Sequence, residues 1–153
     1  MVSFALEDAA SPDAQWCLGQ YFAELATRFE HGFDPAQSLP ADAASMTPPN
    51  GAFIVARMDG RAIGCGAFKM QPAARAYLKR MWISREARGL GLGRRMLAEL
   101  ERVAREMGAE VAQLETNRTL GEAIALYRAS GYTEVAPFND EPYAHHWFEK
   151  RLP

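Results

Sequence analysis

Residues 76–107 read AYLKRMWISREARGLGLGRRMLAELERVAREM, and this stretch decides the fold class. Its first part, Ala76–Ile83, has the apolar content of a central strand. Its last part, Arg94–Met107, places apolar residues at helical spacing, and Gly108 predicts the end of that helix. Between them lies the bend Arg88–Arg94, in which every second residue is glycine. Together with the strand expected at Glu110–Glu115, this order predicts a parallel, right-handed βαβ unit.

The bend Arg88–Arg94 has the chemistry of a phosphate site. Glycines lack a Cβ, permit positive φ and let a ligand approach the backbone. Free amides at the start of the following helix, together with the helix dipole, favour a phosphate or pyrophosphate. Arg88, Arg94 and Arg95 can add charge-assisted hydrogen bonds. A plain structural turn is the alternative. Neither the P-loop nor the G-x-G-x-x-G pattern fits, since position 94 is arginine.

Basic residues are concentrated around this bend. Eight of the 17 lysines and arginines lie between positions 79 and 105. This asymmetry fits an anion site around the glycines, and it equally fits a solvated helix face with pairs at i,i+4.

The rest of the chain continues the alternation of strands and helices. A helix is expected from the cap at Ser11–Pro12 to a stop near Gly32, and another from a capping box at Thr119–Glu122 to Ser130. Asp59-Gly60 predicts a hairpin turn. The further strands are expected at Val2–Asp8, Ala52–Ala56, Ala62–Phe68, Tyr132–Val135 and Ala144–Leu152.

The order of these elements is β-α-β-β-β-α-β-α-β-β, which predicts a mixed α/β sheet with helices on both faces. No linker or repeat divides the 153 residues, so a single domain over residues 1–153 is expected. The long loop Phe33–Asn50 is rich in proline and is expected to cover a binding site.

Composition excludes several classes of protein. Hydrophobic residues make up 48% and charged residues 24%, which argues against disorder, collagen and coiled coil. The net charge of -2 does not favour nucleic acid or a membrane surface, and no apolar run approaches the ~20 residues of a spanning helix. Without a signal-peptide pattern the expected location is cytoplasmic. Cys17 and Cys65 fit no metal or redox spacing and are expected to be free, buried thiols.

Residues Tyr77–Val135 resemble the GNAT superfamily of acyl-CoA-dependent N-acyltransferases. The resemblance rests on Arg88-x-x-Gly91-x-Gly93 between the strand and the helix, on Leu114–Asn117, and on Ala123–Tyr132. The expected element order matches that fold over nearly the whole chain, including a sheet that splays between Ala76–Ile83 and Glu110–Glu115.

The resemblance implies that the chain binds acetyl-CoA. The pyrophosphate is expected on the bend, mainly through backbone amides, and the pantetheine arm on the strand before it. Asn117 is expected to face the cofactor arm, with a loop or capping role as the alternative. The residues implied in cofactor binding are Met81, Trp82, Ile83, Arg88, Gly89, Leu90, Gly91, Leu92, Gly93, Arg94 and Asn117.

The implied reaction is direct attack of an amine on the acetyl thioester. Tyr127 is implied as the acid that protonates the leaving thiolate, and packing on the buried helix face is its alternative role. Many relatives have a glutamate at the position of Tyr77, so a direct carboxylate base there is in doubt. Glu115 is a candidate substitute, with substrate binding or a solvent-facing charge as alternatives. The Met81 amide is a candidate to stabilise the thioester oxygen.

Adjacent His145 and His146 point to opposite faces of a strand and form no two-histidine metal site, so no metal is expected. The function expected from these residues is N-acetyl transfer from acetyl-CoA to a small amine acceptor. A non-catalytic acyl-CoA-binding sensor and a protein-interaction module are the alternatives. A homodimer through a terminal strand or helix is compatible with the sequence.

Overall fold

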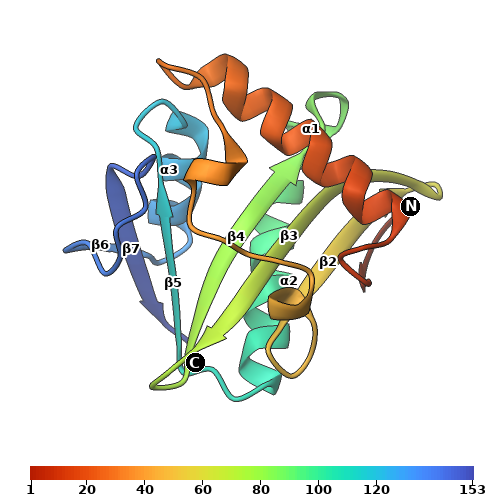
Figure 1. Ribbon diagram of the computed structural model, residues 1–153. Helices are drawn as coiled ribbons and strands as arrows, with labels where there is room; N and C mark the ends of the chain where they lie inside the picture. Colours follow the sequence, from red (N-terminus) through yellow and green to blue (C-terminus); the bar gives the residue numbers. More distant parts are fainter.

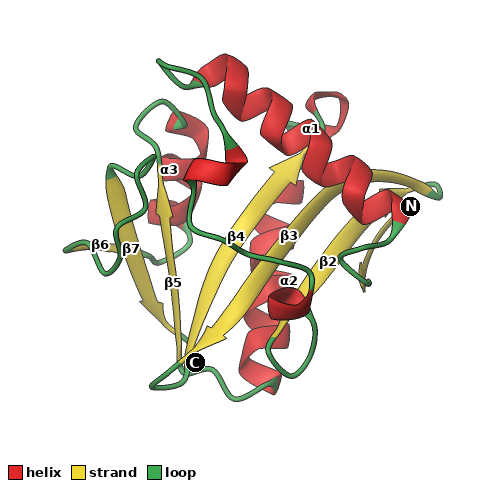
Figure 2. Cartoon of the chain, viewed as in Figure 1, coloured by secondary structure: helices red, strands yellow, loops and turns green.

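The computed structural model describes residues 1–153 and contains one seven-stranded mixed sheet with helices on both faces (Figures 1 and 2). The strands follow the spatial order β1-β2-β3-β4-β5-β7-β6. This confirms the fold class and the element order expected from the sequence. The elements are β1 Val2–Leu6, α1 Pro12–Arg28, β2 Gly51–Met58, β3 Arg61–Gln71, β4 Arg75–Ile83, α2 Leu92–Glu106, β5 Val111–Thr116, α3 Gly121–Ala129, β6 Thr133–Val135 and β7 His146–Arg151.

Two apolar clusters hold the helices to opposite faces of the sheet. Helix α1 covers one face, where Cys17 and Leu18 pack among Phe53, Val55 and other buried side chains. Helices α2 and α3 cover the other face, with buried side chains that include Leu100. Such burial of large apolar side chains contributes about 1.5–3 kcal/mol each, so the two clusters fix the helices relative to the strands.

Strands β4 and β5 are parallel, as expected, but they pair over only three residues each. Arg75–Tyr77 pair with Val111–Gln113, and beyond this point the two strands diverge (Figure 1). The residues from Leu78 to Ile83 therefore have no partner in β5. The expected splay of the sheet is thus present, and it opens toward the carboxyl ends of both strands.

A β-bulge interrupts the pairing of β4 with β3, on the side of β4 opposite this gap. Cys65 of β3 pairs with Trp82 and Ala67 pairs with Lys79, so Arg80 and Met81 together oppose the single residue Gly66. Arg80 has φ +61°, in the left-handed region. Bulges of this kind redirect backbone and side-chain groups, here toward the gap.

One boundary of helix α1 and one of helix α2 differ from expectation. Helix α1 starts at the Ser11 cap, whose side chain accepts a hydrogen bond from the Ala14 amide, but it ends at Arg28, before Gly32. Phe29 leaves helical geometry because its ring packs against Phe33 and Tyr143. Helix α2 starts at Leu92, two residues earlier than expected.

The capping box predicted for α3 is wrong. The residue before this helix, Leu120, provides no side-chain cap, and the Thr119 hydroxyl bonds to Oδ1 of Asn117. The Glu122 carboxylate bonds to Arg28 of α1 at 2.7 Å, so tertiary contacts outcompete the local motif.

The loop between α1 and β2 contains two short 3-10 turns, η1 (Pro35–Gln37) and η2 (Ala44–Met46). Asp59 and Gly60 both have positive φ and form the expected β2–β3 hairpin turn. Cys17 and Cys65 are free and buried. None of the helices combines the length and the apolar character that a bilayer crossing requires, and no group of three or more His, Cys, Asp or Glu residues is placed to hold a metal ion.

Candidate functional site

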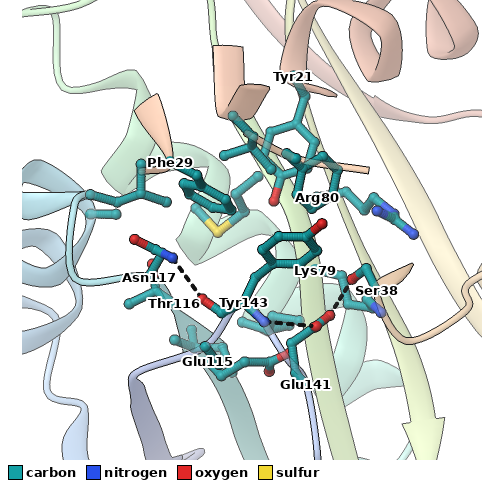
Figure 3. Close-up of a pocket in the computed structure, with 18 of the residues that line it drawn as sticks. Tyr21, Phe29, Ser38, Lys79, Arg80, Glu115, Thr116, Asn117, Glu141 and Tyr143 are labelled. Atoms are coloured by element: carbon teal, nitrogen blue, oxygen red, sulfur yellow. Dashed lines mark hydrogen bonds between the residues drawn. The ribbon is translucent and has the colours of Figure 1, made fainter. Parts of the chain in front are cut away.

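Two cavities meet in the gap between β4 and β5. The larger, of about 470 Å³, is lined by α1, the end of β4, the glycine bend, the start of α2, and α3. The smaller, of about 120 Å³, lies between β4, β5, α1 and the loops that follow α1 and β6 (Figure 3). The residues that line both cavities are Tyr21, Leu25, Met81, Leu120, Ala123 and Tyr127.

The glycine bend, which lines the larger cavity, contains a row of free backbone amides. Six successive amides, from Gly89 to Arg94, donate to no acceptor in the protein. Gly89 and Gly91 have φ values of +84° and +74°, a conformation that favours glycine, and Gly91 caps α2 without a side chain. Free amides at a helix start attract anions, so this bend is built to hold one.

Nine of the eleven residues predicted to bind cofactor line the larger cavity. The two exceptions are Leu90 and Asn117. Leu90 is 60% exposed and does not line the cavity, whereas Leu92 is buried in the core. Leu90 therefore offers only its backbone amide. The nine are Met81, Trp82, Ile83, Arg88, Gly89, Gly91, Leu92, Gly93 and Arg94.

Asn117 lies in the smaller cavity, and both ends of its amide are engaged. Its Nδ2 donates to the Tyr143 carbonyl at 2.7 Å (Figure 3), and its Oδ1 accepts from the Thr119 amide and hydroxyl. This arrangement fits the capping alternative rather than a contact with the cofactor arm.

The arginines near the bend differ in their availability. Arg88 donates to Oε1 of Glu24 at 2.6 Å and to the Ile83 carbonyl at 2.9 Å, so it is tied to α1 and β4. Arg94 is exposed and has no ion-pair partner. Arg95 stacks over Phe4 at 5.0 Å and does not line the cavity.

Tyr127 stands where the two cavities meet. Its ring packs against Tyr132 and Phe148 on the α3 side, while its hydroxyl makes no hydrogen bond with the protein. Burial, reinforced by the negative charge of Glu115, raises the pKa of Tyr127 to about 12. The phenol is thus protonated throughout the neutral range and can donate a hydrogen bond into the gap.

Glu115 of β5 faces the smaller cavity. Its Oε1 accepts a hydrogen bond from the Tyr77 hydroxyl, and its Oε2 is buried without a partner. Burial raises the pKa of Glu115 to about 6, although the Tyr77 hydrogen bond and the positive charge of Lys79 oppose this rise. A carboxylate with this pKa is ionised at neutral pH and can accept a proton near it.

The Tyr77 hydroxyl also accepts a hydrogen bond from the loop that precedes β7. Nδ2 of Asn139 donates to the Tyr77 hydroxyl at 3.2 Å, and Nε1 of Trp147 donates to Oδ1 of Asn139 at 2.9 Å. A chain of hydrogen bonds therefore runs from β7 through the loop before it to the Glu115 carboxylate. Position 77 carries no carboxylate, but the tyrosine there orients one from the neighbouring strand.

Sequence reasoning missed several side chains of the smaller cavity. Glu141 accepts hydrogen bonds from the Ser38 hydroxyl, the Leu39 amide and the Tyr143 amide, so it fastens two loops together (Figure 3). The Tyr143 ring lies 4.7 Å from that of Phe33. Only the length of the Phe33–Asn50 loop signalled this side of the site, because no local motif links these residues.

The two histidines lie outside both cavities. Nδ1 of His145 accepts from the Arg118 amide at 3.0 Å, and His146 bonds Glu134 at 2.8 Å. Burial lowers the pKa of the His145 imidazole, and the positive charge of Arg118 lowers it further. Both histidines have local structural partners.

Comparison with protein families gives a match to the Acetyltransferase (GNAT) family over residues 18–132. A curated relative, the IAA acetyltransferase of Azospirillum brasilense, is 37% identical over 103 residues. The match covers 67% of this chain and 66% of the relative, which is slightly less than two thirds of the relative's length.

Solved structures share the fold at low sequence identity. An acetyltransferase of the GNAT family from Staphylococcus aureus superimposes with a TM-score of 0.83 at 14% identity, and the match covers 100% of both chains. The structure of yncA from Salmonella typhimurium, solved with its cofactor acetyl-CoA, superimposes with a TM-score of 0.71 at 17% identity, over 100% of this chain and 95% of that one. At these identities the likeness shows the fold.

Proposed function

This chain belongs to the GNAT family of acetyltransferases, and from that premise we propose that it moves an acetyl group from acetyl-CoA to the amine of a small acceptor. One observation carries the proposal: the cavity with the anion-binding bend and the cavity with the buried carboxylate share Met81 and Tyr127. A thioester held at this junction is reached by a nucleophile from the other side. Residues 1–153 act in this proposal as one domain.

The larger cavity takes acetyl-CoA in this proposal. The six free amides of the bend hold the pyrophosphate, with Arg94 as a nearby unpaired cation. The backbone of β4 from Leu78 to Ile83 lacks a β5 partner, so the amide groups of the pantetheine arm can pair with it as a strand would. The smaller cavity takes the acceptor.

In the proposed reaction the acceptor nitrogen attacks the carbonyl carbon of the thioester, a C–N bond forms and the C–S bond breaks. An alkylammonium has a pKa of about 10, so a proton must leave before or during attack. Glu115 accepts this proton, and Tyr77 holds its carboxylate toward the gap. The product is an amide, and the proton returns to solvent from Glu115.

During the reaction, negative charge develops first on the carbonyl oxygen of the thioester and then on its sulfur. The bulged backbone at Arg80–Met81 is the candidate donor for the oxygen. The Tyr127 phenol, which has no partner in the protein, donates its proton to the departing thiolate and regains one from the acceptor nitrogen, which loses its second proton as the intermediate collapses to the amide. Burial that raises the pKa of this phenol also raises the pKa of a thiol beside it, so the two remain close enough for proton transfer.

A non-catalytic acyl-CoA-binding domain would use the same bend but would need no second cavity. The buried carboxylate of Glu115, oriented by Tyr77 and facing that second cavity, favours the enzyme over the sensor.

Thiol release from acetyl-CoA, measured with a panel of amines, amino acids and peptides, tests the proposal. We expect release that depends on at least one acceptor. Tyr127→Phe preserves the packing of the ring on Tyr132 and Phe148, so kcat should fall by about 10–100-fold while the Kd for acetyl-CoA stays within about twofold. Acetyl-CoA binding without release for any acceptor supports the sensor, and equal kcat for both proteins removes Tyr127 as the acid.

A further inference from the structure

Two of the six residues that line both cavities have a polar group in the side chain, and both are tyrosines. Tyr127 belongs to α3, and Tyr21 belongs to α1. The proposed reaction uses Tyr127 and gives Tyr21 no role. Because Tyr21 borders both the cofactor cavity and the acceptor cavity, it lies beside the place where the thioester and the amine meet.

The Tyr21 hydroxyl has a free proton to donate. It makes no hydrogen bond with the protein, and its oxygen stays accessible within the cavities, unlike the fully buried Oε2 of Glu115. Burial raises the pKa of Tyr21 well above its ordinary value, although the positive charge of Arg80 opposes this rise. The phenol is therefore neutral at physiological pH, and a ligand oxygen that accepts from it supplies the partner that the protein does not.

Contacts between α1 and β4 hold Tyr21 beside the β4 bulge. The Tyr21 ring lies 5.6 Å from the Phe22 ring, and the Arg80 guanidinium of the bulge lies 4.9 Å from that same Phe22 ring. One turn further along α1, Oε1 of Glu24 accepts a hydrogen bond from Nε1 of Trp82 at 3.3 Å. This part of α1 is thus fastened to β4 on both sides of Met81, and Tyr21 lies on the α1 side of the gap (Figure 3).

The chemistry of the reaction decides which ligand atom suits this donor. Negative charge develops on the carbonyl oxygen and on the sulfur of the thioester, and the proposed reaction already assigns Tyr127 to the sulfur. A neutral phenol that donates to the carbonyl oxygen stabilises the charge there. Donation to the acceptor nitrogen would instead engage the lone pair that attacks the thioester. The carbonyl oxygen is therefore the atom that fits the Tyr21 hydroxyl.

Building on the proposed acetyl transfer, on which this inference rests, we propose that Tyr21 is a catalytic residue that donates a hydrogen bond to the carbonyl oxygen of the bound thioester. The hydrogen bond strengthens as the amine attacks and the oxygen gains negative charge. The proton stays on the Tyr21 phenol throughout, so Tyr21 stabilises charge and Tyr127 alone transfers a proton. The oxygen then has one donor from α1 and a second candidate donor in the bulged backbone of β4.

Infrared difference spectroscopy of acetyl-CoA labelled with carbon-13 at the thioester carbonyl tests this contact without any acceptor. A hydrogen bond to the carbonyl oxygen lowers the stretching frequency of the C=O bond. We expect this frequency to fall when acetyl-CoA binds to the wild type, and we expect Tyr21→Phe, which keeps the ring beside Phe22, to lose much of that fall. In turnover, kcat of Tyr21→Phe should fall by about 10–100-fold, while the KM for the acceptor stays within about threefold.

Tyr132→Phe is the matched control, because the Tyr132 hydroxyl bonds Glu101 at 2.7 Å and Tyr132 lines neither cavity. It should leave both the carbonyl frequency and kcat unchanged. A Tyr21→Phe protein that binds acetyl-CoA with the wild-type carbonyl frequency overturns the inference, even if its kcat is lower, and thiol release by the wild type then leaves acetyl transfer intact. No thiol release by the wild type with any amine of a broad panel overturns the proposed function and the catalytic role of Tyr21 with it.

Discussion

The two cavities that meet at Tyr127 are built in opposite ways. The anion-binding side of the larger cavity consists of consecutive residues, Gly89 to Arg94, and offers backbone amides. The smaller cavity consists of side chains from α1, β4, β5 and two loops, and its carboxylate, Glu115, is held by a hydrogen bond from Tyr77. Backbone chemistry of a short segment is a local property, whereas a cluster of side chains exists only when distant segments meet.

This contrast implies different responses to substitution. A change in the bend alters the conformation of the backbone and should affect binding of any acyl-CoA. A change in the smaller cavity alters one side chain and should affect the pH dependence or the choice of acceptor.

Gly91→Glu should abolish measurable binding of acetyl-CoA. Gly91 has φ +74°, which costs a residue with a side chain about 1–2 kcal/mol, and the added carboxylate competes with the pyrophosphate for the same amides. We expect the Kd for acetyl-CoA to rise by at least about 100-fold in isothermal titration calorimetry.

Gly19→Glu is the matched control for this substitution. Gly19 lies on the exposed side of α1, and a Cβ there meets nothing within 4 Å, so affinity should be unchanged. A Gly91→Glu protein that is folded by circular dichroism and binds acetyl-CoA with wild-type affinity would show that the bend is only a structural turn.

Tyr77→Phe should shift the pH dependence of kcat/KM. The Tyr77 hydrogen bond lowers the pKa of Glu115, which burial raises to about 6. Removing the hydroxyl raises this pKa further, so Glu115 is protonated up to a higher pH and the acidic limb of the profile moves to higher pH. Activity should fall severalfold near pH 6 and change little near pH 8.

The control for this prediction is Tyr132→Phe, which removes a hydroxyl that bonds Glu101 at 2.7 Å outside both cavities. Its profile should match that of the wild type. An unchanged acidic limb in Tyr77→Phe would exclude Glu115 as the base that the profile reports.

Glu24→Gln should have a smaller effect and act on the larger cavity. Although burial opposes its ionisation, hydrogen bonds from Arg88 and other donors keep the pKa of Glu24 below its ordinary value. Neutral glutamine releases Arg88 toward the bend, so acetyl-CoA should bind about two- to fivefold more tightly.

The same substitution should lower the Tm without ligand by about 2–4 °C, because a partly exposed ion pair contributes about 1 kcal/mol or less. Glu99→Gln, which affects a pair with Arg102 on the outer face of α2, is the control and should leave the affinity unchanged. Weaker binding in Glu24→Gln would mean that Glu24 positions Arg88 for the cofactor instead of competing for it.

The elements that matched expectation are those whose structure depends on residues close together in the sequence. The hairpin at Asp59-Gly60, the Ser11 cap and the amphipathic face of α2 follow from local backbone preference and periodicity. The capping box at Thr119 failed because Asn117 offers that threonine a nearer acceptor and Arg28 captures Glu122. Phe29 ended α1 early because its ring has partners outside the helix.

The sequence by itself determined the β-α-β-β-β-α-β-α-β-β order, the parallel crossover and the glycine bend. Each of these depends on interactions between residues close in the chain, which composition and spacing reveal. Only the tertiary structure decided which side chains interact. The Tyr77 hydroxyl donates a hydrogen bond to Glu115, and the Asn117 side chain bonds the Thr119 amide within its own loop. The Arg80 guanidinium makes no hydrogen bond or ion pair and lies against the Phe22 ring. Such pairings, and the burial that raises the pKa of Glu115, depend on distances between segments remote in sequence, and those distances are set when the sheet and its loops pack.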